Sequence, residues 1–139
     1  MRVVRDRISR DEGVAAVEFA LILPVLALLL FGVLEFGRVW SQYQVFQGAA
    51  REGARCAAVA STSGCDIQTA IDHAADPYKP SDPSADVQIL GGGPAPDGCT
   101  DAYQGEDVRV SWEQSLNINI PFWSDVTVTP TIKAVFRCE

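Results

Sequence analysis

The stretch FALILPVLALLLFGVL, residues Phe19–Leu34, decides the fold, because none of its side chains is charged or polar. Extended to Val14–Phe36, the window has 23 residues, and Glu18 and Glu35 are its only charged members. At about 1.5 Å of helical rise per residue the window is roughly 34 Å long, enough to cross a bilayer core of about 30 Å. The sequence therefore predicts a helix that spans a membrane.

The charges on the two sides of this stretch differ. Residues 1–13 contain four arginines and three acidic residues, whereas the chain from Val14 onward contains seven basic and fifteen acidic residues. Basic residues accumulate on the cytoplasmic side of a span, so we expect a cytoplasmic N-terminus and an exported C-terminal part. Trp40 and Tyr43 follow where an aromatic belt would lie. The overall net charge of −7 argues against binding to nucleic acid.

A cleaved secretory signal peptide is the main alternative for the N-terminal segment. Its apolar core is usually about 7–15 residues long and ends at a small-x-small cleavage site. Here the apolar run is longer, and the residues that follow it are EFGR at 35–38. The nearest cluster of small residues is GAA at 48–50. These features favour an anchor that remains in the membrane.

The four cysteines all follow the predicted span, which agrees with export to an oxidising compartment. Four cysteines allow three disulfide pairings. We favour a short clip, Cys56–Cys65, and a second bond, Cys99–Cys138, that ties a loop to the C-terminal end. A zinc site is the rival interpretation, but the sequence has no CxxC pair and we expect no metal.

Glu18 is the most informative residue of the span. A carboxylate inside an apolar segment costs about 2.5–3.5 kcal/mol on insertion scales. One interpretation is that Glu18 marks the start of the span and its side chain reaches the cytoplasmic surface. The other is that the carboxylate finds a positively charged partner within the membrane, which the surrounding sequence favours.

That surrounding sequence resembles a known family. The stretch GVAAVEFA at 13–20 resembles the processing site of type IV pilins and pseudopilins, where a prepilin peptidase cleaves after the glycine. Residues 13–38, together with GAAREGAR at 48–55, are similar to TadE-like proteins. These are minor pilins or pseudopilins of tight-adherence (Flp, type IVb) pilus systems. Phe19 stands where major pilins of this class usually have tyrosine, which favours a minor subunit.

The resemblance implies cleavage after Gly13 and a mature chain that begins at Val14. The new amine of one subunit would pair with Glu18 of a neighbour, so that Glu18 and Phe19 take part in assembly. The implied partners are the prepilin peptidase, the major pilin, other minor pilins and an inner-membrane assembly platform. The implied location is the bacterial inner membrane, crossed once, with the globular part in the periplasm and, after assembly, in the extracellular pilus.

The helix is expected to continue from Val14 to Ala60, with a kink at Pro24. Glu35 and Arg38 lie three residues apart on one face and form either an ion pair or an interfacial stop to the span. Beyond the span, small and apolar residues recur at helical spacing and form one stripe that packs on the exported domain. This stripe contains Val39, Tyr43, Phe46, Ala50, Gly53, Ala57 and Ala60.

The remaining residues predict a small α+β domain, with an antiparallel sheet of three or four strands packed on the long helix and stapled by disulfides. We expect a short helix at 66–75, loops at 76–84 and 91–98, and strands at 85–90, 107–112, 116–120 and 125–136. Pro130 predicts an edge or a bulge in the last strand. The chain thus divides into a leader (1–13), a membrane half-helix (14–36), a periplasmic half-helix (37–60) and a globular domain (61–139).

Nothing in the sequence predicts catalysis or a cofactor. His73 is the single histidine and has no motif around it, so it is interpreted as an exposed helix residue. The acidic residues Asp97, Asp101, Glu106 and Asp107 do not follow a calcium-loop spacing and are interpreted as a solvated cluster. The favoured function is a structural minor pilin. The alternatives are a type II secretion pseudopilin and an unprocessed, membrane-anchored periplasmic binding module.

Overall fold

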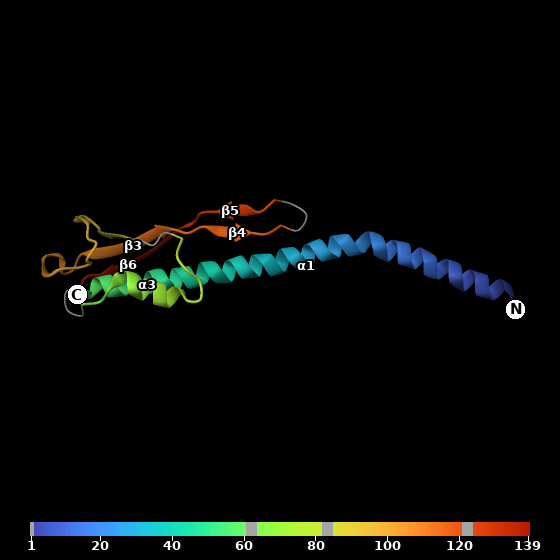
Figure 1. Ribbon diagram of the computed structural model, residues 1–139, viewed down its shortest axis with the longest axis horizontal. Coiled ribbons are helices and arrows are strands. Elements are labelled where there is room, and N and C mark those ends of the chain that lie inside the picture. The colour runs from blue at the N-terminus through green and yellow to red at the C-terminus, as the bar shows by residue number, and fades with distance from the viewer. Residues whose placement is uncertain (1, 61–63, 82–84, 121–123) are drawn as a thin grey trace.

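One long helix organises the molecule (Figure 1). The computed structural model describes residues 2–60, 64–81, 85–120 and 124–139, with side chains from Gly13 onward. Helix α1 (Arg2–Ala58) has 57 residues and ends close to the predicted Ala60. Its predicted start at Val14 was wrong, because the helix already begins at Arg2. Residues 2–12 contain no proline, and a single interior glycine costs only about 1 kcal/mol relative to alanine.

The N-terminal half of α1 extends away from the rest of the protein. From Val14 to Phe36 its large apolar side chains are exposed, and the helix from Gly13 to Ala58 is long and apolar enough to cross a membrane. Figure 1 shows that α1 changes direction in its blue, N-terminal half. Pro24 is the proline inside α1, and its missing N–H and bulky ring explain such a bend.

The C-terminal half of α1 packs on the globular domain. It contacts the short helix α3 (Ile67–Ala75) and two strands of the sheet, β3 (Asp107–Glu113) and β6 (Thr131–Arg137). Small side chains make this contact close, and a Cβ atom added to Gly53 would lie 2.5 Å from Cγ1 of Ile71. The predicted stripe is confirmed, because each of its seven residues is buried or half-buried.

The main sheet has four antiparallel strands in the order β2-β1-β3-β6. Strand β1 (Asp86–Ile89) lies beside β3, and Val87 faces Val110 in the register. Burial alternates along β3, which turns Val108, Val110 and Trp112 into the core. The α+β fold class is confirmed. A 3-10 turn, η1 (Asp101–Tyr103), precedes β3.

Two strand predictions need correction. The segment 125–136 is two strands in two sheets, β5 (Val126–Val128) and β6, separated at Pro130. Proline cannot donate a ladder hydrogen bond, and its carbonyl instead accepts one from the N–H of Gln114 at 3.0 Å. The predicted loop at 91–98 contains a short strand, β2 (Gly93–Pro94). The positive φ angles of Gly91 and Gly93 allow the tight reversal between β1 and β2.

Strand β4 (Leu116–Ile118) is shorter than predicted and pairs with β5 in a separate two-stranded sheet. We call residues 116–120 and 124–128 the β4–β5 hairpin. It lies alongside the middle of α1 and points towards the N-terminal half of the helix (Figure 1).

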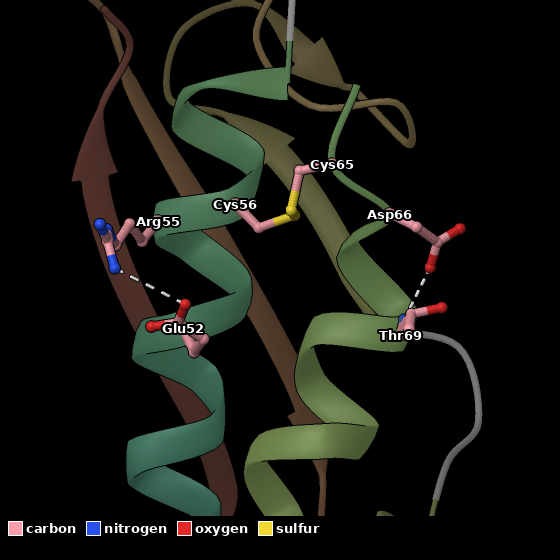
Figure 2. The surroundings of a disulfide bond; sticks show 6 residues. All are labelled: Glu52, Arg55, Cys56, Cys65, Asp66 and Thr69. Carbon is pink, nitrogen blue, oxygen red and sulfur yellow. Dashed lines mark hydrogen bonds and ion pairs between the residues drawn. A yellow bond between two sulfur atoms is a disulfide. The ribbon is translucent and has the colours of Figure 1, made fainter. Parts of the chain in front are cut away.

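Both predicted disulfides form in the structure. Cys56–Cys65 joins the end of α1 to the start of α3, and Asp66 then caps α3 by accepting a 2.6 Å hydrogen bond from the N–H of Thr69 (Figure 2). Cys99–Cys138 ties the loop after β2 to the residue after β6. Together they fasten the C-terminal end of α1 and the end of the chain to the same small domain.

The Gly53 contact is testable with two matched substitutions in α1. We expect Gly53→Ala to lower the free energy of unfolding by about 1–3 kcal/mol, because the added methyl group overlaps Ile71. Gly48→Ala meets no atom within 4 Å and should raise it by about 0.5–1 kcal/mol through helix propensity. Thermal and denaturant unfolding of the full chain in detergent measures both. Equal effects of the two substitutions would show that α1 and α3 are not in close contact.

The two disulfides should contribute unequally. They close segments with sequence separations of 9 and 39 residues. Loss of chain entropy then predicts a stabilisation of about 2.5 kcal/mol for Cys56–Cys65 and about 4 kcal/mol for Cys99–Cys138. Paired Cys→Ala variants, unfolded under identical conditions, measure the difference. A larger loss from the shorter loop would contradict this order.

Candidate functional site

The predicted processing and assembly residues lie on the exposed part of α1. Gly13, Val14, Glu18 and Phe19 are all exposed. A Cβ atom at Gly13 would meet no described atom within 4 Å, so the backbone there is open to an approaching protein. Val14 and Glu18 are four residues apart and therefore lie on the same face of the helix. The structure places these residues far from the sheet, at the end of the molecule marked N (Figure 1).

Glu35 and Arg38 form an ion pair at the point where the globular domain begins to cover α1. Nε of Arg38 donates to Oε2 of Glu35 at 2.9 Å. The side chain of Glu35 is half-buried, while that of Arg38 is partly exposed. The hydrogen bond with Glu35 and its negative charge raise the pKa of the Arg38 guanidinium, which therefore stays charged. The two residues that the sequence placed on one helix face are thus paired.

The same two side chains also bind the backbone of the β4–β5 hairpin. Arg38 donates to the carbonyl oxygen of Asn117 at 2.6 Å, and the N–H of Asn119 donates to Oε1 of Glu35 at 2.7 Å. In an antiparallel pair, every second residue of a strand directs its backbone groups away from the partner strand. Arg38 and Glu35 therefore each bind one backbone group at the edge that faces away from β5, the carbonyl of Asn117 in β4 and the N–H of Asn119 just beyond it. We call this arrangement the edge clamp.

Sequence reasoning missed the edge clamp. The pairing of Glu35 with Arg38 follows from their spacing, but the hairpin contacts join residues 79 and 84 positions apart. On the hairpin side both hydrogen bonds are made by backbone atoms, an accepting carbonyl at Asn117 and a donating N–H at Asn119, so the side chains of these residues carry no signal of the contact. The only available signal was the presence of two opposite charges at the end of an apolar segment.

An apolar groove lies beside the edge clamp. One wall is the face of α1 from Leu28 to Val39, and the other is the end of the hairpin at Ile118–Ile120. The groove has a volume of about 330 Å³, and its lining is almost entirely apolar. Its α1 wall is the C-terminal part of the segment predicted to cross the membrane.

Three aromatic side chains of α1 form a row next to this groove, in which the first pair is stacked and the second is tilted. The ring centroids of Phe36 and Trp40 are 6.1 Å apart and nearly parallel, and those of Trp40 and Tyr43 are 5.9 Å apart. Trp40 is 52% exposed. Amphipathic aromatic rings at the end of an apolar helix are typical of the boundary between membrane and water.

The remaining candidate residues do not come together. His73 is exposed on α3, and the acidic residues Asp97, Asp101, Glu106 and Asp107 are exposed as well. Within the described part of the chain, no group of three or more His, Cys, Asp or Glu side chains is arranged to hold a metal ion.

Comparison with known proteins finds a similarity over most of α1. Residues 13–55 match the family model of TadE-like protein. The recognised similarity is therefore confirmed, and it is consistent with a TadE-like protein of a tight-adherence pilus system. The match includes the residues proposed for processing, the edge-clamp pair and the packed stripe up to Arg55, but not the disulfides or the sheet. No curated protein and no solved structure matches the chain.

The edge clamp is testable by comparing two glutamates of α1. We expect Glu35→Ala to raise the hydrogen-exchange rate of the Asn119 amide by on the order of tenfold, because a hydrogen bond to a charged group is lost. Glu52 has the same i,i+3 spacing to Arg55, but that pair is exposed and its atoms are 3.7 Å apart (Figure 2). Glu52→Ala should leave the exchange unchanged. Unaltered protection of Asn119 in Glu35→Ala would contradict the clamp.

Proposed function

We propose that this chain is a minor pilin, or pseudopilin, of a tight-adherence pilus, with a structural role and no catalytic activity. The observation that carries the proposal is the match of residues 13–55 to TadE-like protein, over a helix whose apolar half is exposed. An exposed apolar helix requires a membrane or other helices around it. A pilin meets both environments in turn, first in the membrane and then in the filament.

Processing is proposed to occur after Gly13. The described surroundings of Gly13 contain no side chain that would block a protease, and the next residue is exposed. Removal of residues 1–13 would take away four arginines and create a new positive charge at Val14. The prepilin peptidase is the partner proposed for this step.

Assembly is proposed to use the new amine and Glu18. The two charges lie about one helical turn apart, on a face that the domain leaves uncovered. An isolated carboxylate in hydrocarbon is costly, so the amine of one subunit and Glu18 of its neighbour favour one register between otherwise smooth apolar helices. The proposed partners are the major pilin and other minor pilins, brought together on an inner-membrane platform.

The proposed orientation places the N-terminus in the cytoplasm and the sheet in the periplasm. The arginine-rich leader supports the cytoplasmic side. One disulfide joins the end of α1 to the globular domain and the other lies within that domain, and both are stable in an oxidising compartment, which supports the periplasmic side. The anchor is then a single span in the bacterial inner membrane, until the subunit enters the extracellular pilus and contributes to adhesion.

The cleavage step predicts the mass of the mature protein. When the chain is produced together with a prepilin peptidase and extracted from the membrane, intact mass spectrometry should find a chain that begins at Val14. Without the peptidase, the protein should retain residues 1–13. Retention of these residues in both samples would favour the unprocessed binding module, and cleavage at a later position would favour a secretory signal.

The charge pairing predicts the effect of removing Glu18. Glu18→Leu should insert into the membrane and be cleaved normally, yet its incorporation into sheared pili should fall by about tenfold or more. Glu52→Leu is the matched control, because Glu52 is exposed on α1 outside the apolar segment and should be incorporated normally. Immunoblots of membranes and sheared pili measure both steps. Equal incorporation of the two variants would remove the argument for pairing.

A further inference from the structure

We propose that the β4–β5 hairpin is a lipid-binding element, whose apolar face contacts the outer layer of the bilayer while α1 spans it. The inference rests on the membrane anchoring in the proposed function. It adds a second membrane contact, formed by a segment outside the match to TadE-like protein. The occupant of the groove beside the hairpin is then the acyl chain of a phospholipid.

The depth of the hairpin along α1 is the first argument. The groove between them reaches from Val39 down to Leu28. From Phe36 to Leu28 the helix descends about 12 Å, at 1.5 Å per residue. This part of α1 is the end of the segment that must fill the hydrocarbon core, so a hairpin beside it cannot remain entirely in bulk water. It lies at the depth of the outer lipid headgroups and the adjoining acyl chains.

The aromatic side chains give independent evidence for where the membrane–water boundary lies along α1. Trp40 is exposed, stacks on Phe36 and lies tilted against Tyr43, and it directly follows Val39 at the end of the groove. Tryptophan and tyrosine prefer the membrane–water boundary, which places that boundary near residues 36–43. The lower part of the groove then lies on the hydrocarbon side of the boundary.

The hairpin has the chemistry of an interfacial element. One face carries Ile118, Ile120, Val126 and Val128, and the other carries polar residues such as Asn117 and Thr127. Ile120 and Val126 are 37% and 43% exposed. Between Gln114 and Ile132 the sequence contains a single charged residue, Asp125. An amphipathic ribbon with so little charge is suited to a surface that is apolar on one side and wet on the other.

The edge clamp lowers the cost of placing the edge of β4 near hydrocarbon. Unpaired backbone groups at a strand edge are costly near hydrocarbon, since no water is available to bind them. Glu35 and Arg38 bind the carbonyl of Asn117 and the N–H of Asn119 at the edge of β4 that faces the helix. The charged pair is in turn neutralised internally, so the contact presents little net charge to the lipid.

Lipid fits the groove better than a second copy of the chain does. The groove is continuous with the exposed apolar surface of α1, which is surrounded by acyl chains before any assembly takes place. Its walls offer almost no polar atoms that would select one protein partner. A flexible acyl chain fills such an open apolar groove without a matching surface.

Spin labels on single added cysteines test the proposal, because all four native cysteines are in disulfides. The full chain is reconstituted in vesicles of phosphatidylethanolamine and phosphatidylglycerol. Labels are placed at Ile120→Cys and Val126→Cys on the apolar face, and at Thr127→Cys on the polar face. Leu29→Cys reports on the span, and Lys133→Cys, exposed on β6, reports on water. Collisions with oxygen, which dissolves in lipid, are compared with collisions with a water-soluble nickel chelate.

The expected result is an oxygen-to-nickel ratio at positions 120 and 126 that is several-fold higher than at 127 and 133, and that approaches the ratio at 29. If position 29 is in lipid but 120 and 126 resemble 133, the hairpin inference is overturned while the anchor stands. If position 29 is also in water, the anchor of the proposed function fails as well. If the labels at 120 and 126 are shielded from both reagents and broaden as protein is added, a second copy occupies the groove and the lipid proposal is wrong.

Discussion

The close packing between the small residues of α1 and the globular domain is the interaction on which the rest of the structure depends. The N-terminal half of the 57-residue helix extends away from the domain (Figure 1), so the position of the helix is fixed by the packing of its C-terminal half. Gly53 and the buried alanines make this packing close, because their small size lets Ile71 of α3 and Val110 of β3 approach the helix backbone. The disulfide at Cys56 then fixes the end of the same helix to α3.

The two glutamates of the apolar segment have different surroundings, and this difference separates their roles. Glu18 is exposed on the part of α1 that the domain does not reach. Glu35 is half-buried and has its partners within the chain, namely Arg38 and the backbone of Asn119. An assembly role is therefore consistent with Glu18, while Glu35 holds two parts of one subunit together.

The edge clamp joins the apolar segment of α1 to the β4–β5 hairpin of the globular domain through hydrogen bonds. It lies between the apolar half of α1 and the packed half, and it fixes a polar strand edge against a helix at that level. Without it, the two backbone groups at Asn117 and Asn119 would lose these hydrogen bonds, which would be costly in the lipid placement proposed above. In that proposed placement, the hairpin adds an amphipathic surface beside the span and enlarges the contact between the small domain and the lipid.

The sequence by itself determined the features that depend on local periodicity. The uninterrupted apolar run specifies the exposed half of α1, the helical spacing from Val39 to Ala60 specifies its packed stripe, and alternation specifies β3 and most of β6. The motif around Gly13 and Glu18, together with the rest of residues 13–38 and the stretch at 48–55, also indicated the family similarity. Only the tertiary structure decided that residues 125–136 divide at Pro130 between two sheets, and that Glu35 and Arg38 bind the edge of β4. The division at Pro130 depends on which strand each part pairs with, β4 for the first and β3 for the second. The clamp depends on side chains of α1 meeting backbone atoms 79 and 84 positions away, and no local pattern of side chains encodes either outcome.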